Sequence, residues 1–155
     1  MKEEIKANDV QIPYGVLHDQ IVNSIKLVDN KIVFTFEIEL YENDFTTEVY
    51  SKYKDFKNCE MTVELYSNED NYVDLYTTLD KHNKFNGIEI SLAELCELYE
   101  KANYISFLNC LSRGYGWIIR FSSSFYDAKG KHKKYKDISS IDIFLLANKI
   151  TWNWY

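Results

Sequence analysis

Val16–Tyr41 reads V-L-H-D-Q-I-V-N-S-I-K-L-V-D-N-K-I-V-F-T-F-E-I-E-L-Y, and this stretch decides the fold. Apolar and polar residues alternate on both sides of Asp29-Asn30, as in strands that place one face on a core. A two-residue turn at Asp29-Asn30 predicts a hairpin. Its register pairs Leu27 with Ile32, Ile25 with Phe34, Asn23 with Phe36, and Ile21 with Ile38. A slip by one residue would expose Phe34 and Phe36, so we expect this register to be firmly set.

Further alternating segments predict two more hairpins. Residues 60–66 and 72–79 alternate on either side of turn-forming residues, and we expect them to pair with each other. Residues 138–147 and 150–155 predict a last hairpin across Asn148-Lys149, with Leu145 opposite Trp152 and Ile143 opposite Trp154. A helix over 139–147 is the alternative, because a short apolar run fits both periods.

The remaining segments complete a mainly antiparallel β chain. Residues 104–111 and 115–122 predict two aromatic-rich strands, residues 1–15 a lead-in with one short edge strand, and residues 42–58 a long loop. Ser91-Leu92-Ala93-Glu94 matches a capping box, and apolar residues follow at helical spacing, which predicts a helix over about 91–103. We expect a single α+β domain over 1–155, curled into a partly closed barrel or sandwich with this helix covering an opening.

Charge is unevenly distributed along the chain. The net charge is −6, yet residues 1–128 hold 12 Lys or Arg against 22 Asp or Glu, whereas residues 129–155 hold 6 against 2. An acidic body disfavours nucleic acid, because binding to phosphates needs a cationic surface. It favours a basic protein partner that is reached through electrostatic steering.

The cysteines and histidines predict neither a metal site nor a cofactor site. Cys59, Cys96 and Cys110 are odd in number and lack C-x-x-C spacing. The three histidines, His18, His82 and His132, lack the spacing of metal ligands. The first ten residues contain no apolar signal core, and no segment reaches the ~18 apolar residues of a membrane span. We therefore expect a cytoplasmic protein with no membrane partner.

His18 and Asp19 are the candidates for catalysis. Imidazole beside carboxylate is suited to acid–base chemistry. If the first hairpin strand extends back through them, however, the two side chains point to opposite faces, and Asp19 lies at the rim of the core. The alternative, which we favour, is that they fix the start of the hairpin through hydrogen bonds to the backbone.

The motif L-H-D-x-I-x-x-S-I, followed by a turn and I-x-F-x-F, resembles the opening of several small bacterial domains of unknown function. Some of these are regarded as immunity proteins, which neutralise a cognate toxin. The resemblance covers about residues 17–40. It implies a β-rich fold and an interaction role, and it brings no catalytic residues.

Two further groups are candidates for binding. Lys131, Lys133 and Lys134 belong to a lysine run that offers phosphate contacts, the alternatives being a solvated loop or a contact with the acidic body or with a second subunit. The aromatic candidates for a pocket or an interface are Tyr115, Trp117, Trp152, Trp154 and Tyr155. The alternative for these aromatic residues is a place in the core.

Together these features predict a non-enzymatic binding protein, specifically an immunity-type inhibitor of a basic partner. A homodimer is compatible with the apolar Phe144 and Leu146, which lie on the second face of the last hairpin. Two alternatives stay open: a hydrolase that uses His18 and Asp19, and a small-ligand binder with an aromatic-lined interior.

Overall fold

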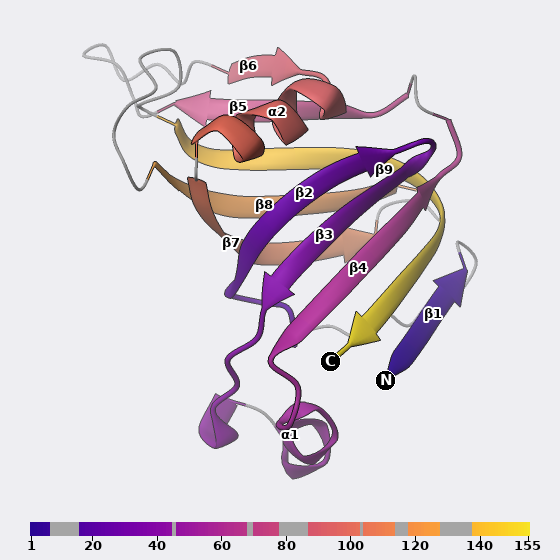
Figure 1. Cartoon of the computed structure of the whole chain (residues 1–155). Coiled ribbons are helices and arrows are strands. Elements are labelled where there is room, and N and C mark those ends of the chain that lie inside the picture. The colour runs from indigo at the N-terminus through magenta and orange to yellow at the C-terminus, as the bar shows by residue number, and fades with distance from the viewer. Residues whose placement is uncertain are drawn as a thin grey trace.

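A computed structural model describes residues 1–6, 16–44, 46–67, 70–77, 87–102, 104–113, 118–127 and 138–155 (Figure 1). Nine strands and two α-helices lie in this part of the chain. The strands are β1 (Lys2–Lys6), β2 (Gln20–Val28), β3 (Lys31–Glu37), β4 (Asn58–Leu65), β5 (Tyr72–Thr77), β6 (Gly87–Ile90), β7 (Tyr104–Arg113), β8 (Ile118–Asp127) and β9 (Ile138–Trp154). The helices are α1 (Thr47–Tyr53) and α2 (Leu92–Ala102), and a 3₁₀ turn, η1, spans Glu42–Asp44.

Strand β9 joins all parts of the sheet because it is long and bent. Strands β5 and β4 follow one another along one of its edges, and β8 and β1 lie along the other. The pairings lead from β9 through β4, β3, β2, β7 and β8 back to β9. The antiparallel sheet therefore curls into a partly closed barrel, which confirms the predicted fold class (Figure 1).

Helix α2 covers one end of this curled sheet and confirms the predicted covering helix. It packs against β2 and β5 and buries Leu92, Leu95, Leu98 and Tyr99. The capping box forms as expected: the Glu94 carboxylate accepts from the Ser91 backbone N–H at 2.8 Å, and the Ser91 hydroxyl accepts from the Glu94 N–H at 3.2 Å.

The first hairpin confirms part of the predicted register. Leu27 faces Ile32 and Ile25 faces Phe34, and Asp29 adopts φ 53°, as the first residue of a primed two-residue turn requires. Beyond Ser24 the prediction is wrong: Val22 faces Phe36, and Ile21 faces Glu37. Asn23 is an extra residue in a bulge, and this bulge places Val22 rather than Ile21 in the core.

Asparagine bulges recur where the sheet curls. Asn109 in β7 and Asn148 in β9 are skipped in the pairing with β8 and β4, as Asn23 is skipped in β2. A bulge increases local twist and bends its strand. Asparagine is disfavoured at regular strand positions. Placing it at the unpaired position of a bulge therefore costs little strand stability.

Two predicted hairpins are wrong. Strand β4 pairs with β3 and β9, and β5 pairs with β6 and β9, so β4 and β5 do not pair with each other. Residues 138–154 form one continuous strand, which also excludes the helix over 139–147. Asn148 bends this strand through a bulge instead of reversing the chain, so Trp152 faces Met61 and Glu3 rather than Leu145.

The segment predicted as a loop over 42–58 contains helix α1, which corrects that prediction. The Thr46 hydroxyl caps the helix by accepting from the Val49 N–H at 3.4 Å. Seven residues are too few for a helix to be stable alone. Its buried residue, Tyr53, packs on Trp154 with ring centroids 4.7 Å apart, and this contact holds it in place.

The other predicted strands are confirmed, although their first and last residues differ from the prediction. Strands β7 and β8 are the two predicted around residue 113, and they pair with each other. Strand β1 is the expected edge strand, paired with β9 over Lys2–Lys6. In β4, Met61, Val63 and Leu65 share the buried face, as their alternation indicates.

Candidate functional site

An acidic surface lies at the end of β3 and on the segment between β3 and β4. Residues 32–51 contain five acidic residues and no lysine or arginine. The members of this acidic surface are all exposed: Glu37, Glu39, Tyr41, Glu42, Asp44 and Glu48. In Figure 1 the segment with η1 and α1 projects beyond the ends of β3 and β4, away from the curled sheet. The carboxylates are therefore presented at one end of the molecule.

Gln20 fixes the start of this segment. Its side chain is buried, its Oε1 accepts from the Glu39 N–H at 2.8 Å, and its Nε2 donates to the Glu39 carbonyl at 3.3 Å. Nε2 is also 3.3 Å from the His18 carbonyl oxygen. The Ile38 N–H donates to the Lys57 carbonyl at 2.8 Å and closes the base of the segment. The acidic surface therefore starts from a fixed backbone.

Glu3 fixes the end of the same segment. Its carboxylate accepts from the Trp154 indole N–H at 2.8 Å, from the Tyr53 hydroxyl at 3.0 Å and from the Lys52 ammonium at 2.6 Å. Glu3 shares the inner face of the sheet with its register partner Trp152. A carboxylate so near the core needs such donors, and three of them tie α1 to β1 and β9.

These contacts shift the pKa values of nearby groups. The hydrogen bond to Glu3 raises the pKa of Lys52 to about 12, and burial raises the pKa of Tyr53. On the acidic surface, a side-chain hydrogen bond with Glu39 raises the pKa of Tyr41. Burial raises the pKa of the Cys59 thiol far above its usual range. Lys52 and Tyr53 therefore stay protonated at neutral pH and remain hydrogen-bond donors to Glu3.

His18 and Asp19 lie in a turn rather than on a strand, so the predicted separation of their side chains is wrong. Asp19 adopts φ 60°, which brings its Oδ2 to 2.8 Å from His18 Nδ1. The side chains are 57% and 66% exposed, so the rim position predicted for Asp19 is also wrong. Within the described part of the chain, the Gln20 side chain makes the hydrogen bonds to the backbone that fix the start of the hairpin. The imidazole and carboxylate form an exposed pair on the surface.

The aromatic candidates separate in the structure. Trp152 and Trp154 are 0% and 1% exposed, which corrects their assignment to a binding surface, since buried rings cannot reach a partner docked outside. They fill the interior between β4 and β9 rather than line an open one. Tyr155 is exposed, and its carbonyl accepts from the N–H groups of Lys57 and Asn58. The other candidates, Tyr115, Trp117, Lys131, Lys133 and Lys134, lie outside the described residues.

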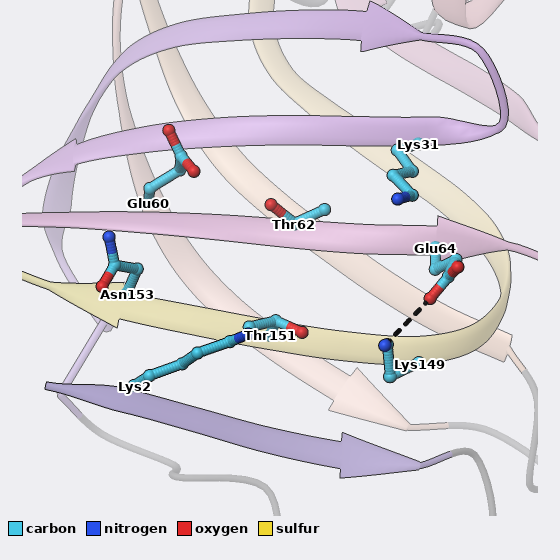
Figure 2. A pocket seen from close by; sticks show the side chains of 8 residues that line it. All are labelled: Lys2, Lys31, Glu60, Thr62, Glu64, Lys149, Thr151 and Asn153. Atoms are coloured by element: carbon cyan, nitrogen blue, oxygen red, sulfur yellow. Dashed lines mark ion pairs between the residues drawn. The ribbon is translucent and has the colours of Figure 1, made fainter.

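A polar groove of about 420 Å³ lies on the outer face of β1, β3, β4 and β9 (Figure 2). It is lined by Lys2, Lys31, Glu60, Thr62, Glu64, Lys149, Thr151 and Asn153. These side chains offer charges and hydrogen-bonding groups, which suit recognition of a polar ligand. In the part of the chain that the structure describes, no group of three His, Cys, Asp or Glu residues is arranged to hold a metal ion.

Sequence reasoning missed Glu3, Gln20 and the groove. Their roles depend on neighbours far away in the chain, such as Trp154 for Glu3, 151 residues away. The carboxylates of Glu37 and Glu39 read as ordinary solubilising residues. The absence of lysine and arginine over residues 32–51 is the signal that marks the acidic surface.

Comparisons with known proteins return no match. No protein-family model matches the chain, and no curated protein or solved structure matches it either. Among the described residues, no helix combines the length and the apolar character needed to cross a membrane.

Proposed function

We propose that this chain is a non-enzymatic binding protein that recognises a basic protein partner, as an inhibitor of the immunity type. The observation that carries the proposal is the acidic surface, which is exposed, free of lysine and arginine over residues 32–51, and fixed at both ends. A field of one sign steers an oppositely charged protein toward its docking site and accelerates association. We propose that the protein acts in the cytoplasm.

The rigid frame of the acidic surface favours protein recognition over a merely soluble loop. Gln20 and Glu3 hold the segment in place before a partner binds. Association therefore loses less conformational entropy at this segment. Tyr41 adds an exposed aromatic ring, 58% accessible, among the carboxylates. Tyrosine is a frequent anchor at protein interfaces because it combines a large apolar ring with a polar tip.

The L-H-D motif supports the same role. His18 and Asp19 lie directly before Gln20, whose side chain holds Glu39, so the motif leads into the acidic surface. The motif resembles the opening of small domains that include immunity proteins. We propose that the shared feature is the framing of an interaction segment rather than catalysis.

The test uses the products of the genes adjacent to this one as defined partners. Each is purified with the full chain, and binding is measured by calorimetry at low and at physiological salt. We expect one basic product to bind, with affinity that falls as salt rises. The charge-reversal variant Glu39→Lys/Glu42→Lys/Asp44→Lys lowers affinity by tenfold or more, since close charge pairs at interfaces couple by about 1.5–7 kcal/mol.

A matched variant separates the local surface from the net charge. Asp70, Glu89 and Glu100 are exposed carboxylates elsewhere, and their reversal to lysine changes the net charge by the same amount. We expect this control to keep most of the affinity. If no adjacent product binds, or if both variants weaken binding equally, the acidic surface is not the recognition site.

A further inference from the structure

The polar groove owes its depth to two short side chains. Thr62 and Thr151 are direct cross-strand partners on β4 and β9, and they form the floor. Longer side chains rise on both sides of this floor, one row from Lys31, Glu64 and Lys149, and the other from Glu60, Asn153 and Lys2. Figure 2 shows both rows, with the floor between them.

The positive charges of the groove are only partly neutralised. Lys149 lies 3.3 Å from Glu64 and 3.6 Å from Glu4, and its hydrogen bond with Glu64 raises its pKa. Lys2 and Lys31 make no ion pair with any described residue. In Figure 2 the Lys31 and Lys2 side chains approach the Thr62–Thr151 floor from opposite sides, with Lys2 reaching toward Thr151. Two ammonium groups therefore face the groove with spare hydrogen-bond donors.

We propose that this groove binds a small organic anion with two separated oxoanion groups, either carboxylates or phosphates. Lys2 and Lys31 each take one oxoanion, because ammonium-to-oxoanion hydrogen bonds are charge-assisted. The hydroxyls of Thr62 and Thr151 donate to the part of the ligand that lies between them. The Glu60 carboxylate, in the same row as Asn153 and Lys2, accepts a hydrogen bond from a hydroxyl or amine of the ligand.

The volume of the groove and the net charge of the protein favour a small anion over an acidic macromolecule as the ligand. The volume of about 420 Å³ lies within the ~300–1,000 Å³ of small-molecule sites. The net charge of −6 repels a large polyanion that spans much of the surface. A small dianion responds mainly to charges within about one Debye length, ~8 Å at physiological salt. The groove lining holds three lysines against two glutamates, and Glu4 contacts Lys149 at its edge, so Lys2 and Lys31 are the cations left for a ligand. The site is independent of the acidic surface, and its test needs no protein partner.

The experiment is an NMR titration of the full chain with citrate and with pyrophosphate at constant ionic strength, with glycerol as the neutral control. We expect saturable shifts of the Thr62 and Thr151 amide signals with at least one anion and none with glycerol. The tighter of the two anions identifies carboxylate or phosphate as the preferred group. Lys2→Ala/Lys31→Ala weakens binding by about tenfold or more, because it removes both free charges.

A second pair of lysines provides the control for net charge. Lys26 and Lys54 are exposed outside the groove, so Lys26→Ala/Lys54→Ala is expected to leave the affinity nearly unchanged. Thr62→Val/Thr151→Val keeps the side-chain shape and is expected to weaken binding without altering the rest of the spectrum. The proposal is overturned if neither anion gives saturable shifts, or if the control lysine pair weakens binding as much as Lys2 and Lys31 do.

Discussion

The two buried tryptophans of β9 offer a matched test of the Glu3 network. Trp154 is 1% exposed and its indole N–H donates to Glu3 at 2.8 Å. Trp152 is 0% exposed, and its indole N–H has no hydrogen-bond partner in the described part of the chain. Substitution by phenylalanine removes the same atoms at each position, so the cavity cost is similar in the two variants. The difference between them isolates the hydrogen bond.

The structure sets the expected size of this difference. Trp154→Phe loses a hydrogen bond to a charged group, about 1.5–3 kcal/mol, and we take the low end because Glu3 keeps Tyr53 and Lys52 as donors. Trp152→Phe removes a buried donor without a partner, which returns about 1 kcal/mol or more of desolvation cost. We therefore expect Trp154→Phe to be less stable than Trp152→Phe by about 2.5 kcal/mol.

Urea unfolding at neutral pH, followed by circular dichroism, measures both free energies of unfolding. Each variant is repeated with Glu3→Gln, so that a double-mutant cycle gives the coupling of Glu3 to each tryptophan. Coupling is expected for Trp154 and not for Trp152, although Trp152 is the register partner of Glu3. Equal losses for the two variants, within about 0.5 kcal/mol, would refute the role assigned to this hydrogen bond.

Three further outcomes are expected. Gln20→Leu leaves the backbone groups of Glu39 without their partner, costs about 1–3 kcal/mol, and accelerates amide exchange at Glu39. Deletion of Asn148 removes the bulge while Trp152 and Trp154 keep their inward face, so we expect β9 to lose its bend at this point and the protein to lose stability; an unfolding free energy equal to that of the parent would contradict this. Because burial raises the pKa of Cys59, the folded thiol keeps its proton while the unfolded thiol loses it near pH 9. Unfolding free energy therefore falls as pH rises above about 9, and Cys59→Ala is expected to reduce that slope.

The local sequence pattern predicted which residues form the strands and which of their faces are buried, but it did not predict which strands lie next to each other. Alternation identified the buried side of β4 because Met61, Val63 and Leu65 point one way in any strand. Alternation does not say which strand lies alongside, so the pairing of β4 with β9 was missed. Asn148-Lys149 has turn chemistry, and the same chemistry also serves a bulge. Helix α1 escaped prediction because its stability comes from Tyr53 packing on Trp154.

The candidate sites show the same limit. The acidity of the chain was visible in its composition, but its concentration on one fixed segment depends on Gln20 and Glu3, which are held by residues distant in sequence. The groove could not be predicted because its two walls come from β1, β3, β4 and β9. Periodicity within one strand carries no information on which short residues become cross-strand partners.

The central place of β9 also sets the order in which the protein can form. Strands β1, β4, β5 and β8 all use β9 as a neighbour, and β9 is synthesised after every one of them. Those strands emerge from the ribosome with edges that stay open until residues 138–154 arrive. The contacts that close the sheet join distant parts of the chain, which is the topology of slow folding. Nascent chains are therefore exposed to edge-to-edge association until β9 has emerged.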